Sequence, residues 1–587
     1  MIKIFKNFTK KDLMLILISI LMITLQVYLD LKLPDYMSSI TALIQSEDTK
    51  ILEILSKGGY MLLCAFGSLL SAVVVGYLTS LLSANFSYNL REKVFKKVLN
   101  LSTAEIKKFK VSSLITRTTN DITQLEMLIA IGLQMLIKAP IMAVWAITKI
   151  VNKSLEWSIL TGVCVLILLI TIGILLVIVF PRFEIVQKLI DKVNGVTEEN
   201  LSGIRVVRAF NAEKFEENRF DKVNKDLTKN QLFNQRCFAI LNPIMNLVMH
   251  FLTLGIYFIG AILINKSGML DKINLFSNMV VFSSYGMQVI ASFLMLAMIF
   301  MIWPRASVSA KRINEVLESD ISIKDGNLEK VNNDLVGTVE FKNVSFKYPD
   351  ADEYLLENIS FKVNKGETIA FIGSTGSGKS TLINLVPRFY DATEGEILVD
   401  GINVKDYKLE TLHNKIGYIP QKAVMFTGTV KSNVAYGNNG KKTPSLEEIK
   451  KSINVAQGTD FVEKMDKKYD SHIASGGTNI SGGQKQRLAI ARAIARKPEI
   501  YIFDDSFSAL DYKTDFLLRQ ELKKYTSDAT NMIVAQRIGT IINADKIVVL
   551  EKGKCVGIGT HKELLKKCKV YKEIALSQLG KEELDNA

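Results

Sequence analysis

Eight consecutive residues have the spacing of a loop that holds a chain of phosphates. They fit the pattern GxxxxGKS and read Gly373, Ser374, Thr375, Gly376, Ser377, Gly378, Lys379 and Ser380. Glycines let backbone N–H groups converge on phosphate oxygens, and the helix expected after the loop adds partial positive charge at its N-terminus. We expect Lys379 to reach the β- and γ-phosphates and Ser380 to offer its hydroxyl to Mg²⁺. The loop therefore predicts a site for ATP and Mg²⁺, with Thr381 as a further contact.

A carboxylate that could complete this site stands at Asp504. Four apolar residues, 500–503, precede it and predict a buried parallel strand that presents Asp504 at its carboxyl end. Such a carboxylate can hold Mg²⁺ directly or through water. The alternative is an aspartate with only a structural role, and the phosphate loop upstream favours the metal role.

A second anion-binding turn lies between these two motifs. Ser481, Gly482, Gly483 and Gln484 precede a basic amphipathic helix that is expected at 485–494. One nucleotide does not need two such sites from one chain. Two chains that face each other head to tail would supply one site each, so the turn predicts a dimer.

The elements that carry these motifs occupy only the second half of the chain. From Gly337 strand and helix segments alternate, as in an α/β domain. Before them come six apolar segments long enough for a bilayer core, which needs about 20 helical residues. These segments are 13–33, 60–84, 129–151, 159–180, 238–264 and 275–303. The expected fold is a membrane α-helical domain with six transmembrane helices, followed by an α/β P-loop nucleotide-binding domain.

The composition of the 587 residues agrees with an apolar and a charged part. Hydrophobic residues make up 48% and charged residues 22%, and the formal net charge is +14. Lysine and arginine gather before the first apolar segment and in the segments between helices two and three and between helices four and five, which predicts that both termini are cytosolic. The chain lacks aromatic-plus-basic nucleic-acid motifs, and its five cysteines form no metal-spaced pair.

Four regions follow from these patterns. We expect a transmembrane domain at 1–305, a linker at 306–336, a nucleotide-binding domain at 337–578 and a C-terminal tail at 579–587. The two long cytosolic loops should each contain a short crossing segment, near 112–121 and near 203–212. Apolar residues in the second segment favour docking onto another domain over packing within the loop.

A few polar residues lie at membrane depth. Asn246, His250 and Gln288 are candidates for a substrate path, because polar residues in membrane helices tend to face a bundle interior or a cavity. Lys138 is expected to extend its ammonium group toward the membrane surface.

This arrangement resembles the ATP-binding-cassette transporters, specifically exporters in which the membrane and nucleotide domains are fused in that order. The resemblance implies that Tyr348 stacks on adenine. It implies that Gln421 senses Mg²⁺ and contacts the coupling segments of the membrane domain. It also identifies 481–483 as the signature motif, 508–511 as the loop that joins two ATP sites, and the two crossing segments as coupling helices.

Two residues depart from the family pattern. The residue after Asp504 is normally a glutamate that orients the attacking water, and here it is Asp505. The switch residue is normally a histidine, and here it is Gln536. An aspartate is one methylene shorter, and an amide cannot carry a positive charge toward the γ-phosphate. The pattern of retained binding residues and altered catalytic residues resembles the degenerate-site subunit of heterodimeric bacterial exporters. A homodimer with two slow sites is the alternative.

The expected function is ATP-driven export of amphipathic or hydrophobic compounds, such as multidrug efflux, across the bacterial cytoplasmic membrane. The expected partners are a second half-transporter, the lipid bilayer and a small amphipathic substrate, with no nucleic acid. Lipid or peptide export stays open, and so does an ATP-gated channel or regulator, whose cassette motifs would look the same.

Overall fold

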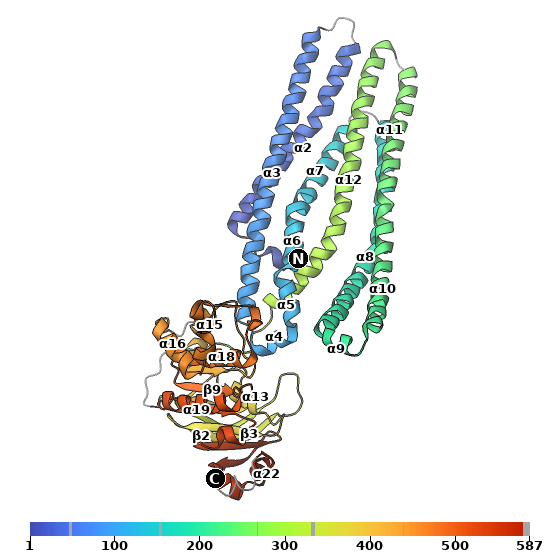
Figure 1. Cartoon of the computed structure of the whole chain (residues 1–587). Coiled ribbons are helices and arrows are strands. Elements are labelled where there is room, and N and C mark those ends of the chain that lie inside the picture. Colours follow the sequence, from blue (N-terminus) through green and yellow to red (C-terminus); the bar gives the residue numbers. More distant parts are fainter. Residues whose placement is uncertain (46–49, 152–154, 267, 330–334, 438–439, 579–587) are drawn as a thin grey trace. The chain divides into compact units, whose positions relative to one another are not determined.

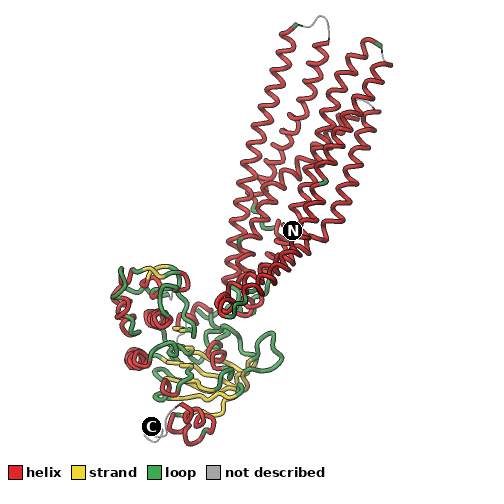
Figure 2. The backbone as a smooth tube through the Cα atoms, turned by 45° about the vertical axis from the view of Figure 1, so that its right-hand side comes forward, coloured by secondary structure: helices red, strands yellow, loops and turns green. Residues whose placement is uncertain are grey.

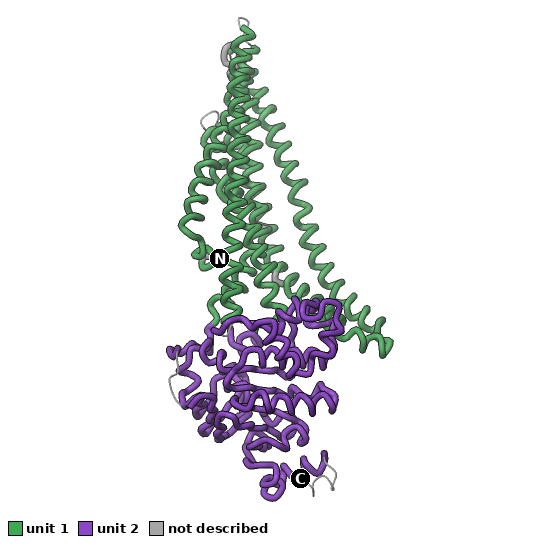
Figure 3. Tube along the Cα trace, turned by 60° about the vertical axis from the view of Figure 1, so that its left-hand side comes forward, with its two compact units in different colours: residues 1–100, 109–319 green, residues 101–108, 320–587 purple. Residues whose placement is uncertain are grey.

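The computed structural model describes residues 1–45, 50–151, 155–266, 268–329, 335–437 and 440–578. The chain divides into two units (Figure 3). The first comprises residues 1–100 and 109–319, and the second comprises residues 101–108 and 320–587. The expected tail at 579–587 lies outside the described residues.

The first unit consists of long helices that run side by side (Figure 1). Among the described residues, six helical stretches are long and apolar enough to cross a membrane, in agreement with the sequence. The helices of this unit are α1 (Ile2–Phe5), α2 (Lys10–Gln45), α3 (Ile51–Leu99), α5 (Val111–Thr118), α6 (Asn120–Met127), a π-helical turn η1 (Leu128–Gly132), α7 (Leu133–Val151), α8 (Leu155–Ser202), α9 (Ile204–Ala209), α10 (Glu213–Ala239), α11 (Leu241–Lys266) and α12 (Met269–Leu317). The expected linker at 306–336 begins inside α12, which continues to Leu317.

The core of the first unit is apolar and lies where the helices meet. Trp157, Phe282 and Tyr285 are among its largest fully buried side chains. Many other apolar side chains point outward, such as Leu62 and Leu63, which are 73% and 67% exposed. Outward-facing leucines on long helices are what a lipid environment accepts.

The short helix α9 lies where the second crossing segment was expected. It joins α8 to α10, and its apolar residues Val206 and neighbouring Phe210 are exposed. The first crossing segment was placed too late in the sequence. Residues 112–121 belong to α5 and α6, within the helical unit, whereas a separate short helix, α4 (Thr103–Phe109), precedes them.

The segment 101–108, which contains most of α4, is part of the second unit. The Thr103 hydroxyl donates a hydrogen bond to the Phe389 carbonyl at 2.9 Å. Ala104 packs against the apolar core around strands β1 (Val339–Phe346) and β2 (Leu356–Val363). Small residues at 103 and 104 leave no apolar periodicity in the sequence, so no pattern marks this segment as one that packs against the second unit.

The strands of the second unit, yellow in Figure 2, form three sheets among the described residues. A six-stranded sheet has the order β12-β11-β3-β10-β9-β6, and a four-stranded sheet has the order β2-β1-β4-β5. A two-stranded ladder joins β7 and β8. The strands are β1 (Val339–Phe346), β2 (Leu356–Val363), β3 (Thr368–Gly373), β4 (Glu394–Val399), β5 (Ile402–Asn403), β6 (Ile416–Ile419), β7 (Gly428–Thr429), β8 (His472–Ile473), β9 (Ile500–Asp504), β10 (Thr530–Val534), β11 (Lys546–Glu551) and β12 (Lys554–Gly559).

Parallel pairing in the larger sheet brings two functional strand ends close together. β10 pairs in parallel with both β3 and β9, so the strands that precede the phosphate loop and Asp505 are separated by one strand only. β3 and β9 are buried along nearly their whole length, as expected for strands covered on both faces.

Helices cover these sheets, and their apolar side chains join those of the strands in several buried clusters. One apolar cluster gathers around β1, β2 and β3, and another lies around α18 and β9. The helices of the second unit, besides α4, are α13 (Lys379–Asn384), α14 (Leu409–Lys415), α15 (Val430–Val434), α16 (Leu446–Val455), α17 (Thr459–Val462), the 3₁₀ turns η2 (Lys468–Asp470) and η3 (Ser475–Gly477), α18 (Gly482–Ala495), α19 (Tyr512–Tyr525), α20 (Ile538–Ile541), α21 (His561–Lys567) and α22 (Lys569–Gln578).

Candidate nucleotide-binding site

The glycine-rich loop lies between β3 and α13, as the sequence predicted. Gly376 and Gly378 have φ angles of 84° and 93°, in the left-handed region that favours glycine. A Cβ atom on Gly378 would also come within 2.6 Å of the Leu356 side chain. The loop residues Ser374, Thr375 and Gly376 are exposed, so their backbone is open to a ligand.

Lys379 begins α13 and turns its ammonium group back over the loop. Its Nζ donates to the carbonyl oxygens of Gly373 and Ser374 at 2.9 and 2.7 Å. Burial lowers the pKa of Lys379, while the nearby carboxylates of Asp505 and Asp504 act in the opposite direction. The ammonium group is therefore held at the loop, where it can meet phosphate oxygens.

Ser380 and Asp504 meet directly. The Ser380 hydroxyl donates to Oδ1 of Asp504 at 2.6 Å, and the Tyr418 hydroxyl lies 3.5 Å from Oδ2 of the same carboxylate. Burial raises the pKa of Asp504, and the charge of Asp505 acts in the same direction. Two oxygen donors beside a phosphate-binding loop are the hard ligands that Mg²⁺ prefers.

These donors fit Mg²⁺ as part of a shared site. Across the described ranges, no group of three or more His, Cys, Asp or Glu side chains could hold a metal ion without help. Mg²⁺ usually keeps waters and takes other ligands from substrate phosphates, so Ser380 and Asp504 supply what such a site requires from the protein.

Asp505 lies directly after the strand and accepts hydrogen bonds from two glutamine amides. Oδ2 of Asp505 is 3.2 Å from Nε2 of Gln421 and 2.6 Å from Nε2 of Gln536. Asp505 is buried and has a φ angle of 48°, whereas both glutamines are exposed. The structure thus brings together the three residues that the sequence singled out for catalysis.

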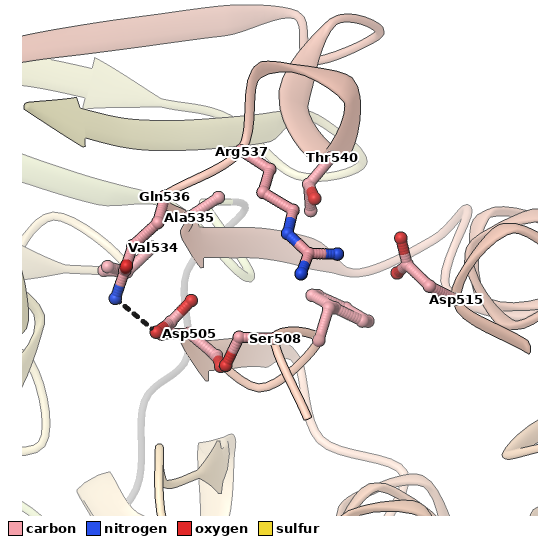
Figure 4. A pocket seen from close by; sticks show the side chains of 9 residues that line it. Asp505, Ser508, Asp515, Val534, Ala535, Gln536, Arg537 and Thr540 are labelled. Atoms are coloured by element: carbon pink, nitrogen blue, oxygen red, sulfur yellow. Dashed lines mark hydrogen bonds between the residues drawn. The ribbon is translucent and has the colours of Figure 1, made fainter. Parts of the chain in front are cut away.

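A cavity of about 230 Å³ opens beside this cluster (Figure 4). Asp505 and Gln536 face each other on one side of it, and Arg537 and Asp515 lie on the other. Ser508 also lines the cavity, and its hydroxyl donates to the backbone carbonyl of Asp505 at 2.9 Å. This bond fixes the start of the loop 508–511 to the Asp505 backbone.

Tyr348 is half-buried at the end of β1. Its hydroxyl lies 3.0 Å from the Thr381 hydroxyl, which connects it to the helix that follows the phosphate loop. Tyr390 packs edge-on against it, with ring centroids 5.3 Å apart. The ammonium group of Lys107, from α4, lies 5.4 Å from the Tyr348 ring centroid. An aromatic side chain next to the loop is positioned to stack on a base.

The Ser-Gly-Gly turn forms the N-terminus of α18. Ser481 and Gln484 make a reciprocal capping box, with Gln484 N donating to the Ser481 hydroxyl at 3.3 Å and Ser481 N donating to the Gln484 side chain at 2.9 Å. Ser481 and Gly482 are exposed, and nothing lies within 4 Å of a Cβ placed on Gly482. The turn therefore leaves the N-terminus of α18 open to an anion. α18 packs in a different apolar cluster from β1 and the phosphate loop.

Sequence reasoning missed several neighbours of the site. Tyr418 bonds to Asn384 at 3.0 Å and approaches Asp504, because β6 pairs in parallel with β9. Tyr390 and Lys107 flank Tyr348. Tyr418 stands in the same short segment as Gln421, but its contact with Asp504 depends on strand order, which cannot be read from one sequence.

Comparison with known proteins identifies both units. Residues 14–302 match the ABC transporter transmembrane region, and residues 356–508 match the ABC transporter family. An uncharacterized ABC transporter ATP-binding protein of Mycobacterium tuberculosis is 38% identical over 521 residues, which cover 89% of this chain and 87% of that protein. A putative multidrug export ATP-binding/permease protein of Staphylococcus aureus is 33% identical over 522 residues, covering 85% of each chain.

The fold also agrees with a solved structure. A bacterial Atm1-family ABC exporter with ATP bound superposes with a TM-score of 0.83 at 24% identity, covering 97% of this chain and 100% of that one. The chain therefore belongs to the ABC transporters, as a half-transporter whose transmembrane region is fused to an ATP-binding domain, and this domain has the ATPase activity that is coupled to transport.

Proposed function

We propose that this chain is the ATP-holding, slowly hydrolysing half of a heterodimeric exporter that moves amphipathic compounds out across the bacterial cytoplasmic membrane. The observation that carries the proposal is the double hydrogen bond from Gln421 and Gln536 to a single oxygen of Asp505. ABC half-transporters act as dimers in the membrane, and the proposal concerns which half this chain is.

The length of the Asp505 side chain supports slow hydrolysis. A glutamate at this position would extend one methylene further from the strand end, and its carboxylate would lie over ~1 Å closer to a water at the γ-phosphate. Misplacement of a catalytic group by about 1 Å can reduce a rate by about 10²-fold. The Asp505 oxygen that accepts from two amides is also less available to orient water.

The neutral side chain of Gln536 also supports slow hydrolysis. An amide has NH₂ donors and a carbonyl acceptor but no positive charge. The NH₂ group of Gln536 donates to Asp505 at 2.6 Å, so it is directed at the carboxylate. A neutral group stabilises the charge that develops on the γ-phosphate in the transition state less than a cation would.

The residues for binding are intact. Lys379 stands over the loop, Ser380 and Asp504 provide two adjacent oxygens for Mg²⁺, and Tyr348 offers its ring beside Thr381. When bound, Mg²⁺ would neutralise phosphate charge. Gln421, which donates a hydrogen bond to Asp505, would contact bound Mg²⁺ and so link the metal to the catalytic carboxylate.

The exposed turn at Ser481 is suited to binding the ATP that a partner chain holds. Its exposed backbone N–H groups at the N-terminus of α18 suit the γ-phosphate of an ATP molecule held by another chain. In a heterodimer this turn would complete the partner's competent site, while the partner would complete the site at Lys379. The distribution of lysine and arginine further predicts that both termini lie in the cytosol, as does the ATP-binding domain.

The substrate class rests on relatives and on the apolar nature of the membrane unit. One relative at 33% identity is named as a putative multidrug export protein. Lipid or peptide export and an ATP-gated channel are the alternatives. Net ATP-dependent accumulation in inside-out vesicles separates export from a channel, because a channel cannot concentrate a compound.

The test is the ATPase rate of the purified chain alone and after co-expression with the product of the neighbouring gene, which we expect to encode the second half-transporter. We expect slow hydrolysis by the chain alone and fast hydrolysis by the pair. Asp505→Asn should leave the rate of the pair nearly unchanged, whereas replacement of the partner's catalytic glutamate should abolish it. Fast hydrolysis by the chain alone would overturn the proposal and indicate a homodimer in which Asp505 and Gln536 suffice.

A further inference from the structure

Two ion pairs lie between neighbouring helices inside the transmembrane unit. Asp30 on α2 pairs with Lys138 on α7, with 3.3 Å between Oδ2 and Nζ. Asp35, also on α2, pairs with Lys149 on α7 at 2.8 Å. Lys138 therefore does not simply extend its ammonium group toward the membrane surface, as the sequence suggested, but meets a carboxylate within the helix bundle.

Hydroxyl groups support both carboxylates. The Ser68 hydroxyl on α3 donates to Oδ1 of Asp30 at 2.5 Å. The Tyr285 hydroxyl on α12 donates to Oδ1 of Asp35 at 2.6 Å and lies 3.0 Å from the Leu31 carbonyl. Tyr285 is fully buried, so the carboxylate of Asp35 is fixed from inside the bundle.

The side chains of both ion pairs are partly exposed to solvent in the described residues. The side chains of Asp30 and Lys138 are 21% and 20% exposed, and those of Asp35 and Lys149 are 27% and 35% exposed. Charge that faces lipid is costly, so ionisable residues in membrane helices almost always face a bundle interior or a water-filled cavity. This face of α2 and α7 is therefore suited to a polar path and unsuited to the lipid surface.

A buried acceptor lies on α12, close in the chain to Tyr285. The side-chain oxygen of Gln288 is buried and has no hydrogen-bond partner among the described residues. Gln288 is three residues from Tyr285, so the two share a face of the helix. An amide oxygen of this kind accepts hydrogen bonds from ammonium groups.

We propose that the ion pairs Asp30–Lys138 and Asp35–Lys149 form a binding site for the headgroup of a zwitterionic amphiphile, that is, a compound with one ammonium group, one carboxylate or phosphate, and an apolar part. This names the substrate class for the export proposed above and rests on that function. The ammonium group binds Asp30, and the anionic group binds Lys138.

Charge balance selects a zwitterion over other amphiphiles. A cation that took the place of Lys138 at Asp30 would leave the largely buried ammonium group of Lys138 without its partner carboxylate, which is costly. An anion at Lys138 would leave Asp30 unpaired in the same way. A zwitterion can open the pair and replace both partners at once, so every charge remains paired.

Binding of three fluorescent probes tests the proposal. They share one dansyl group and one alkyl chain, and they end in an ammonium group, a carboxylate, or an amino acid headgroup with both charges. The full-length chain is co-purified with its partner into phosphatidylglycerol nanodiscs without nucleotide. We expect the zwitterionic probe to bind about ten- to a hundredfold more tightly than either singly charged probe, the range that paired charge-assisted hydrogen bonds supply.

Two double variants separate recognition from structure. Asp30→Asn with Lys138→Gln should remove the preference. Asp30→Lys with Lys138→Asp should retain it, because the restored pair binds the zwitterion in the opposite orientation, and this variant also guards against a folding defect in the first. The control is Asp221→Asn with Lys225→Gln, the same change at an exposed ion pair on α10, which should leave the preference unchanged.

Equal binding of all three probes to the natural protein, or a preference that persists in the neutralised variant, would overturn the proposal. Competition by phosphatidylethanolamine added to the nanodiscs would identify a lipid headgroup as the zwitterion, and absence of competition would identify a soluble compound. The measurement involves no hydrolysis, so fast ATP turnover by the chain alone would refute the slow-subunit proposal without affecting this result.

Discussion

Asp505 illustrates how much a single side-chain length can determine. The sequence located this residue by its position after a buried strand, and the structure adds that both Gln421 and Gln536 donate to the same carboxylate oxygen. Residues 84 and 31 positions away in the chain meet there. Their convergence follows from the parallel pairing of β6, β9 and β10, which places three strand ends at one edge.

The first prediction concerns these two altered positions. Asp505→Glu combined with Gln536→His should raise hydrolysis at this chain's own site by on the order of 10²-fold, because the longer side chain reaches the attacking water and the histidine can carry positive charge. The rate is measured as phosphate release by the dimer with the partner's catalytic glutamate changed to glutamine, so that only this site contributes.

Asp505→Asn serves as the control for that experiment, since it preserves size and removes the charge. It should leave the already slow rate of the natural site nearly unchanged. A double variant that is no faster than the natural chain would show that the slow rate has another origin than these two side chains.

At the scale of elements, α16 and α18 begin with the same local structure. Ser445 and Glu448 form a capping box at α16, with Glu448 N donating to the Ser445 hydroxyl at 3.3 Å. Ser481 and Gln484 form one at α18 with the same 3.3 Å contact. The two serines therefore have equal structural roles, and only one of them lies in the Ser-Gly-Gly turn.

The second prediction uses this match. Ser481→Ala and Ser445→Ala should each lower the free energy of unfolding by about 1 kcal/mol, which is the typical value for loss of an N-cap hydroxyl. Only Ser481→Ala should also slow ATP hydrolysis by the dimer, because in the proposed arrangement its hydroxyl and neighbouring N–H groups would face the partner's nucleotide. Thermal unfolding and steady-state ATPase rates of both variants measure the two effects.

An equal fall in ATPase rate for both variants would contradict this role, since it would trace the loss to stability alone. A Ser481→Thr variant keeps a capping hydroxyl and should restore most of the lost stability.

The sequence predicted local features better than contacts between distant residues. The phosphate loop, the strand before Asp504 and the six spanning helices are encoded in short windows, where spacing and hydrophobicity suffice. The pairing of Asp30 with Lys138 joins residues on different helices and depends on how these helices pack. The first crossing helix was misplaced because its contact residues, Thr103 and Ala104, are small and carry no apolar pattern.

At the scale of the whole molecule, the segment 101–108 links the two functions. It belongs to the unit that binds ATP, yet the chain continues from it directly into α3 on one side and α5 on the other. Its Lys107 lies over the ring of Tyr348, and its Ala104 packs against the same apolar cluster as Tyr348. A change at the nucleotide can therefore reach two membrane-spanning helices through one short segment.

The third prediction tests this link. Ala104→Arg should reduce transport and the stimulation of ATP hydrolysis by transported compounds, while the affinity for ATP stays within about twofold. A long cation in place of a packed methyl group cannot be accommodated without loss of apolar contact or burial of charge. This costs about 1–3 kcal/mol, which lowers the population in which α4 packs against the core by about 5- to 150-fold. Val111→Arg, at a 63% exposed position just after α4, is the control and should leave both quantities unchanged. Equal effects of the two arginines would show that α4 has no special role in coupling, whereas a selective loss for Ala104→Arg would establish that ATP binding reaches the transmembrane helices through this segment.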